Sequence, residues 1–202
     1  MWRCTVCQHI GLEETTPVQC PVCDSPKEKF VPYQPPVGGA KTWQNLRDAF
    51  VGESQAHVRD LAFARQASAE ELPQIAKLFR AIAAAEEVHA YNNLRLLGLV
   101  RDTQENLDTA FQRENLAETK MYPKFIADAN EENAPEAGVN FSQARDVDGV
   151  HGKLYQKAAQ HLTVDTETTY YVCQVCGYVS DGLLPDQCPI CGAPKDKFKK
   201  ID

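Results

Sequence analysis

The sequence has no apolar run that approaches the roughly 18 residues needed to span a bilayer, so no transmembrane helix is expected. Its first residues, MWRCTVCQHI, lack the charged and apolar regions of a secretory signal, and we expect a soluble, cytoplasmic protein. Basic residues are not in excess, because 21 Lys and Arg stand against 28 Asp and Glu, for a net charge of −7. This balance argues against nucleic acid or an anionic membrane as a partner.

Cysteine is absent from the 149 residues between Cys23 and Cys173, and all eight cysteines lie towards the two ends of the chain. Their spacings are C-x2-C-x12-C-x2-C and C-x2-C-x11-C-x2-C. Small disulfide proteins spread their cysteines through the chain, whereas paired C-x2-C motifs that close a short loop are typical of metal sites. We therefore predict two tetracysteine metal sites, one formed by Cys4, Cys7, Cys20 and Cys23 and the other by Cys173, Cys176, Cys188 and Cys191.

The two ends also form an internal repeat. WRCTVCQHIGLEETTPVQCPVCDSPKEKF aligns with YVCQVCGYVSDGLLPDQCPICGAPKDKF, including the Cys-Pro-Val/Ile-Cys pair and the closing Pro-Lys-acid-Lys-Phe. Each repeat is too small to hold a hydrophobic core without a metal ion. We expect modules at residues 1–34 and 168–202, with a Pro/Gly-rich linker at 35–41 and a polar connection at 163–169.

The central region, residues 42–163, is expected to be helical. Apolar periodicity and punctuation by Pro and Gly indicate four segments, at 42–67, 70–98, 102–131 and 141–162. Pro123 predicts a kink or irregularity in the third, and NAPEAGVN (133–140) predicts a break before the fourth. Four helices of this length indicate a four-helix bundle.

Two helical segments carry an acid three residues before a histidine: Glu86 before His89, and Asp148 before His151. Residues three apart on a helix project together and can bind one metal ion. Since chance alone gives about 0.7 such pairs in a chain of this composition, exposed helix charge is the better interpretation of either pair taken alone.

The arrangement of the acids favours the metal. Single candidate acids, Glu53 and Glu114, fall on the first and third segments, while the acid–histidine pairs fall on the second and fourth. One Glu from each of two helices and Glu-x-x-His from each of the other two is the ligand pattern of di-metal carboxylate bundles. The metal would also compensate the cost of placing acids inside a bundle.

These motifs resemble those of the rubrerythrins over essentially the whole chain. The resemblance rests on FVGESQAHVRDLAFA, AAAEEVHA, ENLAETKMYPKF and VDGVHGKLYQKA in the middle. At the ends it rests on the rubredoxin-like CTVCQHI with CPVCDSPKEKF and CQVCGY with CPICGAPKDKF. It implies a mainly α protein, a ferritin-like four-helix bundle flanked by two small rubredoxin-like modules with short β-strands. The usual member has one such module, so this chain resembles a double-rubredoxin variant.

The resemblance also implies a reaction. The diferrous bundle site would reduce hydrogen peroxide to water, and rubredoxin-type iron would return electrons supplied by a pyridine-nucleotide reductase or a rubredoxin. Two irons would lie in the bundle and one iron or zinc in each tetracysteine site, in a homodimer. The implied catalytic and di-iron residues are Glu53, Glu86, His89, Glu114, Tyr122, Asp148 and His151, of which Tyr122 lies beside the metals and the others bind them.

Three positions depart from the family pattern. Ala117 stands where the third helix usually has a second glutamate, and Glu118 is expected to be solvated because it lies about 40° beyond Glu114 around an α-helix. Asp148 is one methylene shorter than the usual glutamate, and Asp60 stands where a tyrosine is common. The open alternatives are therefore an oxygen-dependent ferroxidase and a non-catalytic electron-transfer or zinc-binding protein.

The two modules differ at their knuckles. Gly177 and Gly192 permit the tight turns that direct backbone N–H groups at sulfur, but the first module has Gln8 and Asp24 there. Both adopt a left-handed backbone less readily than glycine, so we expect the first site to differ in potential or to hold structural zinc. His57 is expected to lie beside the metal site or at the surface, and His9 and His161 are expected to be solvated.

Overall fold

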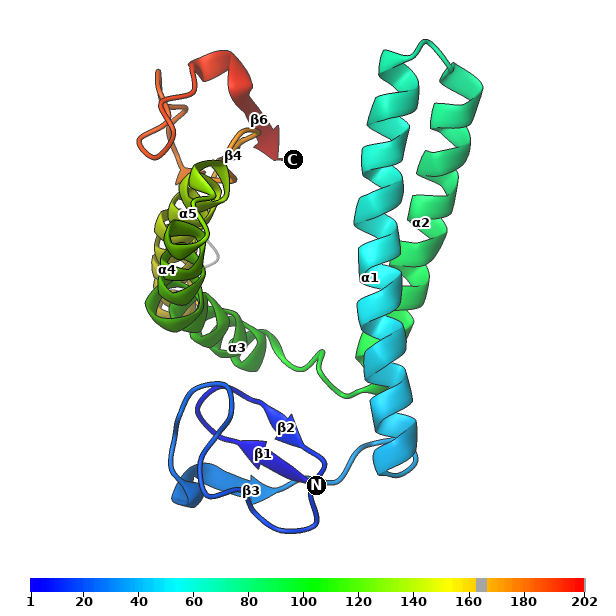
Figure 1. Cartoon of the computed structure of the whole chain (residues 1–202), viewed down its shortest axis with the longest axis vertical. Coiled ribbons are helices and arrows are strands. Elements are labelled where there is room, and N and C mark those ends of the chain that lie inside the picture. The colour runs from blue at the N-terminus through cyan, green and yellow to red at the C-terminus, as the bar shows by residue number, and fades with distance from the viewer. Residues whose placement is uncertain (163–166, 202) are drawn as a thin grey trace. The chain divides into compact units, whose positions relative to one another are not determined.

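The computed structural model describes residues 1–162 and 167–201, so part of the expected polar connection lies outside the described residues. The chain divides into two compact units. The first comprises Met1–Arg3, Ile10–Thr16 and Val31–Arg101, and the second comprises Cys4–His9, Pro17–Phe30 and Asp102–Asp202. The helices and the two small sheets are labelled in Figure 1.

The first unit is built on a helical hairpin of α1 (Ala40–Ala69) and α2 (Pro73–Leu96), which run side by side (Figure 1). The buried residues of α2 are Ala76, Ala83 and Ala90, seven residues apart, so one stripe of small side chains lets the helices approach closely. Both predicted helices are confirmed. The second begins at Pro73, whose missing N–H suits a first helical position, and not at the acidic pair before it.

The second unit contains α3 (Thr103–Leu116), a π-helical segment (Ala117–Met121), α4 (Tyr122–Glu131) and α5 (Pro135–Gln160). Asp102 caps α3 by accepting a hydrogen bond from the Glu105 backbone N–H at 2.9 Å. The irregularity predicted at Pro123 is confirmed, since the π-helical segment ends one residue before α4 begins. The predicted break at 133–140 is too long, because Pro135 already starts α5.

The two ends fold as matching three-stranded antiparallel modules. The first has β1 (Trp2–Cys4), β2 (Ile10–Gly11) and β3 (Phe30–Pro32) in the order β2-β1-β3. The second has β4 (Tyr170–Cys173), β5 (Val179–Asp181) and β6 (Phe198–Ile201) in the order β5-β4-β6. A short 3-10 helix precedes the last strand of each, at Lys27–Lys29 and Lys195–Lys197, so the sequence repeat is a structural repeat.

The modules have small cores. Ile10 of the first packs with Trp43 and Leu97, and the Tyr33 hydroxyl donates to the Leu97 carbonyl at 3.0 Å. The buried cluster of the second is Cys173, Cys188 and Ala193, so half-exposed aromatic and metal-ligating side chains complete it. A core made largely of cysteine needs the metal for stability, as expected.

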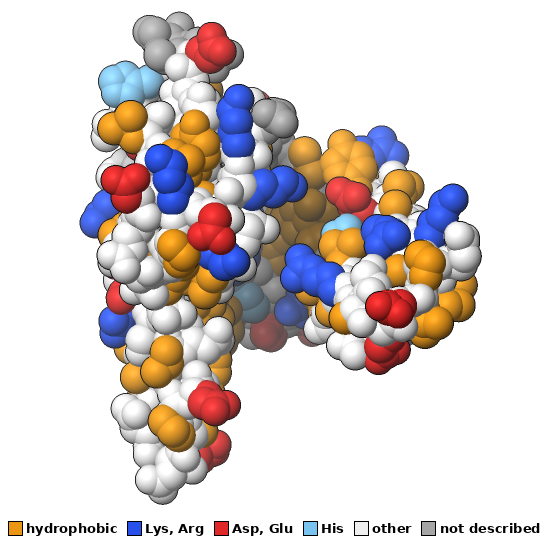
Figure 2. Space-filling view, turned by 90° about the horizontal axis from the view of Figure 1, so that it is seen from above, with side chains coloured by type: hydrophobic (Ala, Val, Ile, Leu, Met, Phe, Trp, Pro, Cys, Tyr) orange, Lys and Arg blue, Asp and Glu red, His pale blue; other side chains and the backbone are white. Residues whose placement is uncertain are grey.

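No helix within the described residues is long and apolar enough to cross a membrane. On the face seen in Figure 2, acidic and basic side chains are interspersed among apolar ones. This agrees with the modest net charge of −7.

Candidate metal centres

The first module brings Cys4, Cys7, Cys20 and Cys23 together. The Sγ atoms are 3.7 Å apart between Cys4 and Cys23 and 3.6 Å apart between Cys7 and Cys20. Four sulfurs placed tetrahedrally about 2.3 Å from a metal ion are about 3.8 Å apart, so the four thiols fit such an ion. We call this the N-terminal tetracysteine site.

The second module repeats the geometry. The Sγ atoms are 3.8 Å apart between Cys173 and Cys191 and 3.6 Å apart between Cys176 and Cys188. All eight cysteines of the two modules are free thiols in the structure, as a metal-binding role requires. We call the second set the C-terminal tetracysteine site.

Backbone N–H groups donate to the sulfurs in both sites. Burial raises the pKa of Cys7 and Cys176, and the backbone N–H groups of His9 and Tyr178 act against that effect. At Cys23 burial is outweighed by hydrogen bonds from the hydroxyl and backbone N–H of Ser25, which lower its pKa to about 7. Such donors stabilise thiolates and tune the potential of a bound metal. His9, predicted to be solvated, is instead half-buried at the knuckle.

The knuckles have the same backbone in both modules. Gly177 (φ 85°) and Gly192 (φ 74°) are left-handed, and so are Gln8 (φ 61°) and Asp24 (φ 60°). The Gln8 N–H donates to the Cys4 carbonyl at 3.0 Å, as the Gly177 N–H does to Cys173 at 2.9 Å. The first module therefore reaches the standard geometry without glycine, at a conformational cost of roughly 1–2 kcal/mol per residue.

The hairpin brings Glu53 of α1 together with Glu86 and His89 of α2, with one ligand atom of each within 4.8 Å of the others. His89 Nδ1 lies 2.9 Å from Glu86 Oε2, as expected for residues three apart on one helix. His57, the other candidate nearby, donates from Nδ1 to the Ala83 carbonyl at 2.8 Å and so ties α1 to α2. We call Glu53, Glu86 and His89 the α1–α2 group.

The second unit brings Glu114 of α3 together with Asp148 and His151 of α5, again within 4.8 Å. His151 Nδ1 lies 3.9 Å from Glu114 Oε1 and 3.8 Å from Asp148 Oδ1. Its other nitrogen, Nε2, donates to the Gly177 carbonyl at 3.1 Å. That bond places the proton on Nε2, so the Nδ1 lone pair faces the two acids and is available to a metal. We call these three residues the α3–α5 group.

The acids of the α3–α5 group are poised for a cation. Burial, the charge of Asp148 and a hydrogen bond with it raise the pKa of Glu114 to about 7. Burial also raises the pKa of Asp148, and Glu118 adds to the effect. Ionising both of these half-buried acids costs free energy, because two negative charges then lie close together. A bound metal ion would supply the positive charge that stabilises both carboxylates.

Three further side chains lie near the α3–α5 group. Tyr122 lies near the acids of this group, since burial and then the charges of Asp148 and Glu114 raise its pKa. Burial and the charge of Glu114 also raise the pKa of Tyr155, a residue that was not predicted from the sequence. Its position four residues after His151, on the same face of the helix, is the signal that could have identified it. The prediction that Glu118 is solvated is wrong, since its carboxylate is half-buried against Gly149 of α5.

Both modules contact the part of the chain that runs from α3 to α5. Lys120, in the π-helical segment, donates to the Cys23 carbonyl at 2.9 Å and pairs with Asp24 Oδ2 at 2.5 Å. On the other module, Lys157 of α5 pairs with Asp181 at 2.5 Å, and His151 of the same helix bonds to Gly177. The residue directly after Cys23 therefore contacts the π-helical segment that follows α3, and the residue directly after Cys176 contacts α5.

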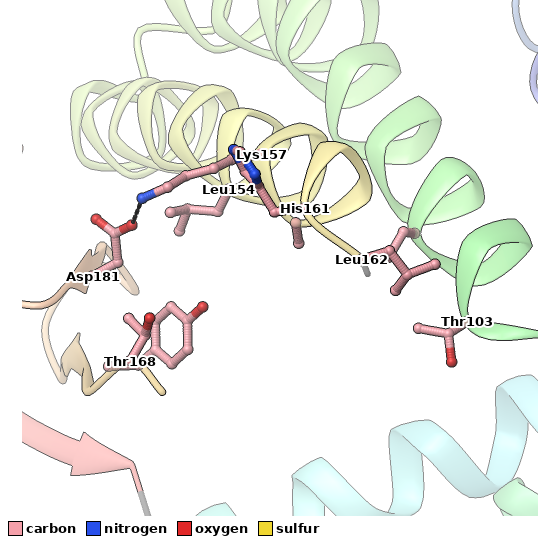
Figure 3. A pocket seen from close by; sticks show the side chains of 10 residues that line it. Thr103, Leu154, Lys157, His161, Leu162, Thr168 and Asp181 are labelled. Atoms are coloured by element: carbon pink, nitrogen blue, oxygen red, sulfur yellow. Dashed lines mark hydrogen bonds and ion pairs between the residues drawn. The ribbon is translucent and has the colours of Figure 1, made fainter. Parts of the chain in front are cut away.

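A cavity of about 500 Å³ lies between α3, α5 and the second module (Figure 3). Its lining includes Thr103, Leu154, Lys157, His161 and Asp181, with Lys157 and Asp181 paired at one side. None of the described residues that line it belongs to the α3–α5 group, so the metal chemistry is placed elsewhere.

Comparison with protein families gives two matches. The rubrerythrin family model matches residues 44–159, and the model for the rubredoxin-like domain of rubrerythrin matches residues 2–31 and 171–199. The match therefore covers the helices and both modules.

Individual proteins agree. The chain is 33% identical to Rubrerythrin-2 of Clostridium acetobutylicum over 180 residues, which covers 81% of this chain and 98% of that protein. It is 33% identical to Nigerythrin of Nitratidesulfovibrio vulgaris over 171 residues, covering 78% and 85%. A solved structure of partially reduced nigerythrin matches with a TM-score of 0.50 at 32% identity, covering 82% of this chain and 88% of that one.

Proposed function

Because the chain belongs to the rubrerythrin family, we propose that it is a non-haem di-iron peroxidase that reduces hydrogen peroxide to water. The observation that carries the proposal is the position of His151. One of its ring nitrogens faces Glu114 and Asp148, and the other is bonded to the residue that follows Cys176. A metal ligand is thus joined by one hydrogen bond to a tetracysteine site.

The donor sets fit the metals. The tetracysteine sites have the sulfur spacing of a tetrahedral ion, and the two carboxylate–histidine groups supply hard oxygen and imidazole donors. When bound, two ferrous ions would supply the two electrons that peroxide reduction requires, and tetracysteine iron would supply the electrons that restore them. The bundle irons would be held by Glu53, Glu86, His89, Glu114, Asp148 and His151.

Residues around the site orient the His151 ring and can donate protons. The Gly177 carbonyl keeps the His151 proton on Nε2 and holds the ring with Nδ1 towards the acids. Tyr122 retains its phenolic proton at neutral pH, because burial and the nearby acids raise its pKa, so its hydroxyl is a donor beside the site. Peroxide reduction consumes protons, which a hydroxyl at this position can supply.

A complete di-iron centre needs both carboxylate–histidine groups, and exposed apolar side chains support this pairing. Large apolar side chains are exposed along both helices of the hairpin, among them Val58, Leu78 and Val88 at 66%, 56% and 57%. Such an accumulation on one element is typical of a surface that another element covers. We propose that α3, α4 and α5 cover the hairpin in a ferritin-like four-helix bundle.

The link between α2 and α3 favours a homodimer that exchanges these helices. It consists of residues 97–102, which span at most about 20 Å when extended. A ferritin-like bundle needs one long crossover along the helices, and the 24 residues of α2 extend about 36 Å. The link is therefore too short to run along the length of α2 within one chain. Pairing of α1–α2 from one chain with α3–α5 from a second chain avoids the need for a long link.

The electron donor is proposed to be a pyridine-nucleotide reductase or a rubredoxin that reduces the tetracysteine sites. Two alternatives remain in view because of Ala117 and Asp148: a ferroxidase that prefers oxygen, and a non-catalytic electron-transfer or zinc-binding protein. They differ from the peroxidase in what oxidises the reduced protein.

The test is stopped-flow oxidation of the anaerobically reduced, iron-loaded protein. A peroxidase is oxidised faster by hydrogen peroxide than by oxygen, and the colour of its ferric tetracysteine sites returns in step. Faster oxidation by oxygen would identify the ferroxidase. Unchanged colour in peroxide would favour the non-catalytic protein.

A further inference from the structure

The third helical segment changes its backbone where the family pattern is broken. Ala117 is the first residue of the π-helical segment, and the Tyr122 N–H donates to the Ala117 carbonyl five residues back. A π-turn holds one more residue than an α-turn, so the positions after Ala117 are rotated relative to a regular α-helix. The 40° offset expected for Glu118 on an α-helix therefore does not apply.

Glu118 is directed at α5. A Cβ atom added to Gly149 would lie 2.5 Å from Glu118 Oε1 and 2.8 Å from its Cδ, so the carboxylate occupies the space that a side chain at position 149 would need. Gly149 is itself buried and directly follows Asp148. The glycine thus forms a cradle for this carboxylate beside a residue of the α3–α5 group.

We propose that Glu118 is a further ligand of the bundle metal, supplying from the next position the carboxylate that Ala117 lacks. This inference rests on the proposed di-iron site. Glu118 is outside the 4.8 Å cluster of Glu114, Asp148 and His151 among the described residues, so ligation requires its side chain to turn from Gly149 towards Asp148. Because Gly149 has no side chain, α5 leaves space for the Glu118 carboxylate next to Asp148.

The charge balance of the site is consistent with a ligand. Glu114 and Asp148 lie with one histidine, the charge of Glu118 acts on Asp148, and all three acids are partly buried. Carboxylates in such surroundings are stable when they bind cations, and they are the donors that iron and manganese accept. A purely structural Glu118 would need its shape and its contact with Gly149, but not its negative charge.

Manganese provides a probe of this site alone. With both tetracysteine sites filled with zinc, the full-length protein is titrated anaerobically with Mn²⁺, and free Mn²⁺ is measured by electron paramagnetic resonance. Glu118→Gln keeps the shape and removes the charge, and Glu131→Gln removes an exposed acid from α4 as the control. We expect E118Q to weaken Mn²⁺ binding by about tenfold or more, and E131Q to leave it unchanged.

A rescue variant separates ligation from packing. In Ala117→Glu/Glu118→Gln the acid returns to the family position, so affinity is expected to recover to within a few-fold of the original protein. A crystal structure with Mn²⁺ is expected to show a Glu118 oxygen about 2.1 Å from a metal ion.

The outcomes distinguish the two proposals. If E118Q binds Mn²⁺ as the original protein does while Glu114→Gln binds it poorly, the role of Glu118 is overturned and the metal site stands. If E114Q and E118Q both bind unchanged, the carboxylate metal site itself is overturned. Loss of affinity in E118Q, together with a Mn²⁺ crystal structure in which no Glu118 oxygen contacts the metal, would show that its charge acts from a distance and would also overturn the inference.

Discussion

His151 and Gly177 are joined by a hydrogen bond of 3.1 Å between Nε2 and the carbonyl oxygen. The bond joins α5 to the turn that follows Cys176, and it leaves Nδ1 facing Glu114 and Asp148. One imidazole therefore belongs to a candidate metal site and contacts the neighbouring metal module. The orientation of this imidazole is therefore coupled to the knuckle of the C-terminal tetracysteine site.

His151→Ala is expected to weaken iron binding in the bundle by at least about tenfold, because ligand atom and orientation are both lost. Metal analysis should show bundle iron falling while both tetracysteine sites remain filled. His57→Ala serves as the control, since His57 bonds to the Ala83 carbonyl and not to a metal group. Equal loss in the two variants would contradict the assignment of His151.

The metal-free protein should lose stability as the pH rises from about 4.5 to about 7. The pKa of Glu114 is raised from 4.5 to about 7, so its contribution is fully present below pH 4.5 and is lost as the pH passes 7. Melting temperatures of metal-free protein across this range would show the fall. Glu114→Gln should flatten the profile, and an equally steep fall in that variant would assign the effect to other groups.

Gln8→Gly should stabilise the first module by roughly 1 kcal/mol, because glycine adopts the left-handed backbone at this position without a side-chain clash. The reciprocal change at the matching knuckle, Gly177→Gln, should destabilise the second module by a similar amount. Resistance of each zinc-loaded module to chelator-induced unfolding measures both effects. A loss of stability in Gln8→Gly would show that its side chain, which contacts the Thr5 carbonyl at 3.4 Å, outweighs the backbone strain.

Lys120→Met should loosen the first module where it meets the π-helical segment, since it removes the contacts with Cys23 and Asp24. Amide hydrogen exchange at residues 20–24 is expected to rise a few-fold, a modest change because the ion pair is exposed. Lys124→Met, at an exposed position on α4, is the control. Identical exchange in both variants would show that the contact does not hold the module.

The repeated modules were predictable from the sequence because metal ligation imposes fixed cysteine spacing on a short chain. The pairing of Cys173 and Cys176 with a second C-x2-C motif predicted a metal-binding knuckle, and the structure has backbone N–H groups directed at the Cys173 sulfur. The four helical segments followed from apolar periodicity. The acid–histidine pairs were predictable too, because residues three apart on one helix share a face.

The features that could not be predicted from the sequence depend on backbone geometry and on contacts between helices and strands. Glu118 was assigned to solvent by assuming 3.6 residues per turn, but the π-helical segment changes the rotation after Ala117. The contact between His151 and Gly177 joins residues 26 apart through tertiary packing, for which one chain carries no pattern. Asp24 looked like a poor replacement for glycine, yet its side chain gains Lys120 as a partner.

The most direct test of the account is anomalous diffraction from crystals of the iron-loaded protein, recorded above and below the iron and zinc edges. We expect iron at each tetracysteine site and two irons bound by the α1–α2 and α3–α5 groups together, with Glu118 in contact with one of them. Zinc confined to the tetracysteine sites, with no metal at Glu53, Glu86, His89, Glu114, Asp148 and His151, would contradict the di-iron assignment.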